Sequence, residues 1–202
     1  LNRRQRRQSG APTQSFSESG LRLQYQEETL NHGQWQLFAD TPRRSGDPST
    51  GAWGAFSFAA RSPTGSRLTA RNLGFPLSPS TFADIGLGDI NSEVTDGLSR
   101  GQRLSLGNST LRGASLRVFT DTTDLRTGWG QRGQFTGAPY AGFERTSGEL
   151  SWLGLTRRFD DQRYASAQLN RATDAQALFA NGRLGLIDST GYALAIGQGY
   201  QI

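Results

Sequence analysis

Few side chains in this sequence have the types and spacing that catalysis requires. His32 is the single histidine, and it lies in the turn-like stretch Leu30-Asn31-His32-Gly33, where spacing places no nucleophile or carboxylate beside it. A Ser-His-Asp triad assembles in space rather than in sequence, so the pattern leaves that alternative open. We interpret His32 as an exposed turn residue. We therefore expect no enzymatic activity and name no catalytic residue.

The acidic residues do not form a recognisable metal site or hydrolytic pair. The stretches 121–124 and 160–161 supply oxygen ligands, but neither has the alternating carboxylates and glycine of a calcium loop. Glu144 and Glu149 are a possible pair for glycoside chemistry, without a supporting constellation around them. Because the chain has no cysteine, thiol catalysis and Cys-ligated metals are excluded. We expect neither a metal nor a cofactor.

A glycine-rich stretch, residues 128–142, could bind a ligand through its rings and guanidinium groups. Its glycines spell G-x-G-x-x-G, but that fingerprint acts only between a strand and a helix, and the sequence offers no helix after it. We interpret the stretch as a long loop. Aromatic rings stack on sugar faces and guanidinium groups bind carboxylates, while a loop that packs on its own rings is the alternative. The candidate binding residues are Trp129, Arg132, Tyr140 and Arg145.

The composition indicates one folded domain with a basic surface. The chain has 202 residues, 26 glycines, a net charge of +5 and 22 basic residues, all of them arginine. No apolar run approaches the length of about 18 residues that a membrane-spanning helix needs. The arginine cluster of residues 3–7 could attract phosphates or anionic lipid headgroups, but we favour the alternative of a solvated terminal arm or linker. We expect residues 1–19 to be a flexible tail or linker, and we expect no nucleic-acid partner.

The rest of the chain, residues 20–202, shows the period-two alternation of strands. Leu21, Leu23 and Tyr25 alternate with polar residues, and similar patterns recur at 34–37, 52–61, 103–106, 111–120, 149–159 and 163–171. A helix is credible only at 169–180, and a turn is predicted at 188–191. Roughly eight to ten strands with frequent turns predict an all-β, antiparallel domain. The architecture is a β-barrel, or part of a larger barrel, with a β-sandwich as the alternative.

The last strand favours the barrel over the sandwich. From Tyr192 to Ile202, large residues alternate with small or polar ones, so the two faces differ sharply. Elsewhere the polar alternates are mostly Gln, Arg, Ser and Asn, and aromatic residues fall near predicted strand ends, as in membrane barrels. Arginines on the inner face would line a lumen or contact cargo. The candidates are Arg22, Arg103, Arg112 and Arg157.

One short stretch resembles a known family. Arg103-Leu104-Ser105-Leu106-Gly107-Asn108 followed by Leu111-Arg112-Gly113-Ala114-Ser115-Leu116 resembles an early barrel stretch of fimbrial outer-membrane ushers, and Leu87-Gly88-Asp89-Ile90 is similar. The likeness covers 15 to 30 residues, with a shorter turn and with Asn108 in place of the usual acid. It implies a Gram-negative outer-membrane export barrel, or a fragment of one.

We therefore predict a non-catalytic outer-membrane β-barrel, a pore or export channel for a protein or polysaccharide. Membrane lipid is the expected partner, the cargo is the exported polymer, and further protein subunits stay open as partners. The alternative is a soluble β-sandwich, secreted or periplasmic, that binds carbohydrate or protein through the 128–145 region.

Overall fold

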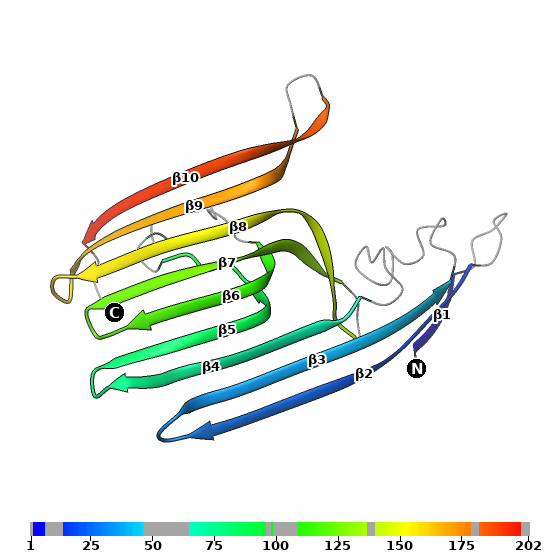
Figure 1. Ribbon diagram of the computed structural model, residues 1–202, viewed down its shortest axis with the longest axis horizontal. Helices are drawn as coiled ribbons and strands as arrows, with labels where there is room; N and C mark the ends of the chain where they lie inside the picture. Colours follow the sequence, from blue (N-terminus) through cyan, green and yellow to red (C-terminus); the bar gives the residue numbers. More distant parts are fainter. Residues whose placement is uncertain are drawn as a thin grey trace.

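The computed structural model describes residues 2–6, 14–46, 65–95, 98, 109–136, 140–178 and 182–198. These residues form ten strands in a single antiparallel sheet (Figure 1). The strands are β1 (Asn2–Arg6), β2 (Gln14–Thr29), β3 (Gly33–Gly46), β4 (Arg67–Ser78), β5 (Thr81–Asn91), β6 (Thr110–Phe119), β7 (Thr123–Thr136), β8 (Gly142–Arg158), β9 (Arg163–Leu178) and β10 (Leu184–Gln198). The all-β, antiparallel prediction is confirmed.

The sheet is an up-and-down meander in which each strand pairs with the next one along the chain. The nine pairs extend from Asn2↔Glu18 in β1 and β2 to Gln198↔Arg163 in β10 and β9. Within the described residues β1 does not pair with β10, so the sheet is open and its two edges are β1 and β10. Those residues include no second sheet of the kind that a sandwich requires.

The two ends of the strands differ in the length of their connections. At one end, called here the turn edge, β2–β3, β4–β5, β6–β7 and β8–β9 are joined by two to four residues each. At the opposite end, called the loop edge, longer connections join β3–β4 and β5–β6, spanning 47–66 and 92–109. Figure 1 shows the turn edge on the left, where the tight hairpins align.

Two glycines inside the long strands, Gly88 and Gly148, have a positive φ. Gly88 in β5 has a φ of 89°, and a Cβ there would overlap the Leu68 carbonyl oxygen. Gly148 in β8 has a φ of 86°, and a Cβ there would overlap the Thr173 carbonyl oxygen. Only glycine fits both conditions without strain. Beyond Gly148, toward the loop edge, β8 turns away from β9 and approaches β3 and β4 (Figure 1).

The apolar core of the described residues is small. It consists of Ile90, Leu111, Leu150 and Trp152, with Ala172 packed against them. These side chains come from β5, β6, β8 and β9, on the half of the sheet near the loop edge. The described residues form no second apolar cluster of this kind, and most of their large apolar side chains are exposed.

The local structure differs from the predictions in several places. Strand structure begins earlier than expected, because β1 and the first residues of β2 lie inside the stretch 1–19 that we predicted to be a tail. The glycine-rich stretch 128–142 is largely strand, in β7 and β8, since its glycines fit against side chains and backbone of neighbouring strands rather than forming turns. The helix at 169–180 is replaced by β9, and the turn at 188–191 lies within β10 next to a register shift.

The strand predicted at 52–61 and the first arm of the hairpin predicted at 103–106 lie outside the described residues.

Candidate functional site

The two faces of the sheet carry opposite chemistry. On one face, called the apolar face, large side chains project outward and remain exposed, for example Leu23 on β2, Leu87 on β5 and Leu194 on β10. Among the described residues, 22 large hydrophobic side chains are exposed and seven hydrophobic residues are buried. The opposite face, called the polar face, carries the alternate residues of the same strands. This distribution is the reverse of the usual arrangement in soluble proteins.

A network of charged groups occupies the polar face near the turn edge. Arg117 Nε donates to Asp124 Oδ1 at 2.9 Å, and its Nη1 donates to Asp84 Oδ2 at 3.4 Å. Arg126 Nη2 donates to Asp124 Oδ2 at 2.7 Å, and its Nη1 donates to the Val94 carbonyl at 2.8 Å. Two arginines therefore share one carboxylate, and one of them also holds the chain that follows β5. Such charge-assisted pairs are stronger than neutral hydrogen bonds.

The chain after β5 folds across the polar face. We call residues 92–95 the inward segment. The Thr95 amide donates to Gln168 Oε1 at 2.9 Å, and Gln168 Nε2 donates to the Glu93 carbonyl at 3.1 Å. The Thr95 hydroxyl lies 2.8 Å from Ser166 Oγ. Thr95 is fully buried, and its partners come from β9, so the inward segment spans from β5 to β9 over the intervening strands.

The sheet is shaped to receive this segment. A Cβ at Gly154 of β8 would overlap the Thr95 methyl group, so only glycine leaves enough room there. Ser166 Oγ, which contacts Thr95, also lies 2.8 Å from Thr156 Oγ1. The buried hydroxyl groups of Thr95, Ser166 and Thr156 thus form a continuous chain, which satisfies polar groups that would otherwise be costly to bury.

A polar cavity of about 260 Å³ lies beside the inward segment. Arg71, Asp84, Glu93 and Ser115 contribute polar groups to its wall. Its lining therefore presents both signs of charge. A lining with both signs of charge suits water or ions better than it suits an apolar ligand.

Toward the loop edge, the ends of β7 and β8 fold over the polar face of β2, β3 and β4. A Cβ at Gly20 on β2 would meet the Tyr140 ring, and Arg44 Nη2 donates to the Tyr140 carbonyl at 3.3 Å. Beneath this contact, Arg44 Nε donates to Glu18 Oε1 at 3.1 Å, with both side chains fully buried. Arg67 on β4 stacks on the Phe135 ring of β7, 4.9 Å from its centroid.

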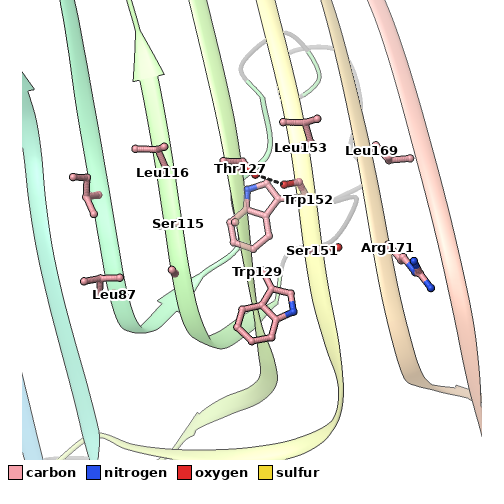
Figure 2. Close-up of a pocket in the computed structure, with 13 residues that line it drawn as sticks. Leu87, Ser115, Leu116, Thr127, Trp129, Ser151, Trp152, Leu153, Leu169 and Arg171 are labelled. Atoms are coloured by element: carbon pink, nitrogen blue, oxygen red, sulfur yellow. Dashed lines mark hydrogen bonds between the residues drawn. The ribbon is translucent and has the colours of Figure 1, made fainter. Parts of the chain in front are cut away.

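A well-defined groove lies on the apolar face (Figure 2). Its volume is about 730 Å³, and it runs over β5 to β9. Leu87, Leu116, Leu153 and Leu169 line it, while small residues at Ala114, Ser115, Gly128 and Ser151 form part of its lining. Trp129 and Arg171 flank Ser151 on the neighbouring strands, since Ser151 pairs with both. The groove is apolar along most of its length and carries a cation at one side.

The four arginines predicted to face a lumen lie in different places. Arg22 lies on the polar face, where its Nε donates to Asp40 Oδ1 at 2.6 Å. Arg112 forms a two-pronged pair with the buried Asp89 carboxylate, at 2.6 and 2.9 Å. Arg103 lies outside the described residues.

Arg157 corrects the prediction, because it alternates with Leu153 and Leu155 and so lies on the apolar face. It sits at the turn edge, where its Nη1 donates to the hydroxyls of Thr122 and Thr123. The sequence pattern missed this placement because an arginine on the same side as leucines looks like a strand end or a break in alternation.

The predicted binding residues do not share a loop. Trp129 projects from β7 on the apolar face, and its Nε1 donates to Glu149 Oε2 at 3.2 Å. Arg132 lies at the register shift of β7, opposite Leu111 of β6, whereas Arg145 on β8 is exposed. Tyr140 packs against β2, as described above. The proposed aromatic groove for sugar or peptide is therefore not assembled by these four residues.

The residues considered for catalysis lie apart from one another. The His32 carbonyl accepts a hydrogen bond from Asn72 Nδ2 at 2.8 Å. Glu144 is buried and Glu149 is exposed, so the two carboxyl groups have different environments. In the β8–β9 turn, the amides of Gln162 and Arg163 and the Arg163 guanidinium lower the pKa of Asp160, which caps the turn. No group of three metal-ligating side chains occurs in the described ranges.

Across the described part of the chain, no helix has the length and hydropathy that crossing a membrane demands. Comparison of the chain with protein-family models, with curated proteins and with solved structures gives no significant match.

Sequence reasoning missed the inward segment and the charged network that holds it. A local signal for the network exists, since Asp124 and Arg126 alternate with Leu125 and Thr127 along β7. The partners Val94, Ser166 and Gln168 are far away in sequence and offer no such signal.

Proposed function

We propose that this chain forms part of the wall of an outer-membrane β-barrel that surrounds a polar passage for an exported protein or polysaccharide. The observation that carries this proposal is the inversion of the sheet, with exposed apolar side chains on one face and ion-paired, buried polar side chains on the other. In a membrane barrel, lipid covers the first face and the lumen lies against the second.

The covering segments support this orientation. Two segments of the described residues fold back over the sheet, the inward segment and the start of β8 near Tyr140, and both lie against the polar face. In a soluble sandwich, we expect covering segments to pack on the leucines rather than on hydrogen-bonded glutamines, because burial of apolar surface contributes the larger free energy of folding. The apolar face is thus the face left for a different medium.

The dimensions of the apolar face match a bilayer. On β8, the outward side chains between Glu149 and Arg157 are Ser151, Leu153 and Leu155. Eight residue steps at about 3.3 Å give about 26 Å along the strand. With the usual tilt of about 40°, that length corresponds to about 20 Å of height, near the apolar band of about 25 Å in known barrels.

The apolar band also shifts sideways between strands, as tilted strands require. On β2 the band comprises Leu21, Leu23 and Tyr25, whereas on β3 its outermost member is Trp35, which pairs with Glu27. The band therefore moves two residues toward the turn edge in one step. A horizontal membrane crosses tilted strands at successively displaced positions, and this displacement is the shear of a closed barrel.

In the described residues the sheet is open at β1 and β10, so closure of a barrel requires these edges to pair with each other or with further strands. The faint usher-like stretch at 103–116 agrees with an export barrel, and the inward segment would narrow the passage beside the polar cavity of about 260 Å³. The soluble binding module stays the second candidate, but Trp129, Arg132, Tyr140 and Arg145 do not converge on a shared groove.

A charge placed on the apolar face distinguishes the two candidates. Leu153→Arg on β8 should lower the free energy of unfolding in phospholipid vesicles by about 2–4 kcal/mol if Leu153 faces lipid. In water the same exposed position should tolerate arginine within about 0.5 kcal/mol. Urea unfolding of protein refolded into phosphatidylcholine vesicles measures the difference, and Arg158→Leu at the exposed strand end of β8 is the matched control. Wild-type protein that stays monodisperse without detergent, or an L153R variant with unchanged stability in vesicles, would contradict the proposal.

A further inference from the structure

We propose that the groove on the apolar face binds a phosphorylated glycolipid of the outer leaflet, of the lipid A type, with an acyl chain along the groove and a phosphate at Arg171. This inference rests on the proposed function, because it needs the apolar face to meet a membrane.

The shape of the groove fits an acyl chain. Leucines from four strands, Leu87, Leu116, Leu153 and Leu169, stand around a trough whose volume is about 730 Å³. The trough exists because Ala114 and Ser151, which lie on the same face as the leucines, leave space between the larger side chains. A flexible hydrocarbon chain fills such a trough better than a rigid ligand does, and burial of each methylene contributes about 0.8 kcal/mol.

The charge at one side of the groove selects an anionic headgroup. Arg171 is exposed, and within the described residues its guanidinium has no hydrogen-bond or salt-bridge partner. The nearby carboxylate of Glu149 is engaged by the indole N–H of Trp129 at 3.2 Å. Guanidinium groups bind phosphate through parallel N–H donors, so a phosphate complements Arg171.

The position of Arg171 identifies which leaflet supplies the lipid. On the apolar face of β9, Arg171 is the next outward residue after Leu169 toward the loop edge. It pairs with Ser151 of β8, and the next outward residue of β8 toward the loop edge is the charged Glu149. The pair of Arg171 and Ser151 therefore marks one limit of the apolar band. It is the limit on the side of the loop edge. In outer-membrane barrels the short turns lie in the periplasm and the long connections lie outside. The cation therefore lies at the outer leaflet, where the anionic amphiphile is the phosphorylated glycolipid.

The experiment measures lipid binding by the full chain in a neutral detergent. The probes are purified bis-phosphorylated lipid A and, separately, phosphatidylglycerol, and native mass spectrometry counts the bound lipids. Wild-type protein should retain one lipid A. Arg171→Gln should weaken that binding about five- to tenfold, because one cation at a headgroup contributes about 1 kcal/mol or more. Ser151→Phe should weaken it by filling the trough without removing the charge.

The control is Arg157→Gln, which removes an arginine from the same face at the opposite limit of the band and should leave binding unchanged. Equal lipid A affinity for wild type, R171Q and S151F would overturn the site. Equal affinity of wild type for phosphatidylglycerol and lipid A would overturn the choice of lipid. Flotation of the wild type with phosphatidylcholine vesicles is measured in parallel, so protein that floats yet ignores lipid A refutes this site alone, whereas protein that fails to float refutes the proposed function.

Discussion

Replacing Gln168 by leucine should release the inward segment from the polar face. Gln168 is buried on β9, and its amide group accepts from the Thr95 amide and donates to the Glu93 carbonyl. Leucine has a similar size but no polar atoms, so two backbone groups lose their partners. An unsatisfied buried group costs about 1–3 kcal/mol, which gives about 2–6 kcal/mol for the pair if the segment stays in place.

The segment can avoid most of that cost by leaving the sheet and meeting water. The lower figure of about 2 kcal/mol then sets the minimum shift in its release equilibrium, and this corresponds to about a thirtyfold change in population. Hydrogen exchange, read by mass spectrometry on a peptide that contains Thr95, measures it directly. We expect the Thr95 amide of the Q168L variant to exchange about thirty times faster than that of the wild type.

Two further variants make the result specific. Ser166→Ala removes one hydrogen bond to the Thr95 hydroxyl and should accelerate exchange about fivefold, since one such bond contributes about 1 kcal/mol. Gln162→Leu changes an exposed glutamine in the β8–β9 turn and should leave exchange at Thr95 unaffected. Unchanged protection of Thr95 in Q168L would refute the assignment of Gln168 as the residue that holds the segment.

Two other perturbations test the ends of the sheet. Asp89→Ala should destabilise the protein by about 3–5 kcal/mol, because it leaves the Arg112 guanidinium and the Leu68 amide without their buried carboxylate partner. Urea unfolding in detergent should show this loss, whereas the control Asp161→Ala, in an exposed turn, should change the stability little. Acidification should loosen the β8–β9 turn, because the pKa of Asp160 is lower in the folded chain than its ordinary value of 3.8. The stability that ionised Asp160 contributes is therefore present above pH 3.8 and is lost as the pH falls through the folded pKa. Hydrogen exchange of the Gln162 and Arg163 amides at decreasing pH measures it, and Asp160→Asn should abolish the pH dependence.

The strands with strict alternation were predictable from the sequence. Leu21, Leu23 and Tyr25 in β2 and Leu111 to Phe119 in β6 lie in strands as predicted, because a period of two places one kind of side chain on each face. The glycine-rich part of β7 was not predictable in this way. Gly128, Gly130 and Gly133 suggest a loop by composition, whereas each one faces a ring or a neighbouring backbone that excludes a side chain. A local rule cannot detect such a close approach, because the partner comes from another strand.

The sites depended still more on distant partners. Arg22 and Arg112 were identified as functional candidates by residue type, and both pair with an acid that lies 18 or 23 residues away. The inward segment has no local pattern, since its partners Ser166 and Gln168 lie more than 70 residues further along the chain. The sequence around Arg171 gives no signal of a site, because its pattern also fits a helix. Only the pairing of β8 with β9 places Arg171 beside Ser151 and the groove.

Perturbations on the two faces should respond to the medium in opposite ways, and this contrast follows from the inversion itself. Leu153 contacts the surroundings, so replacing it by arginine matters only when lipid surrounds the sheet. Gln168 contacts the chain's own inward segment, so its replacement exposes Thr95 in detergent and in lipid alike. In a barrel wall, substitutions on the lipid-facing side change stability only in lipid, whereas substitutions on the other side have the same effect in every medium. In a soluble sandwich, substitutions on the buried face would destabilise the protein in every medium.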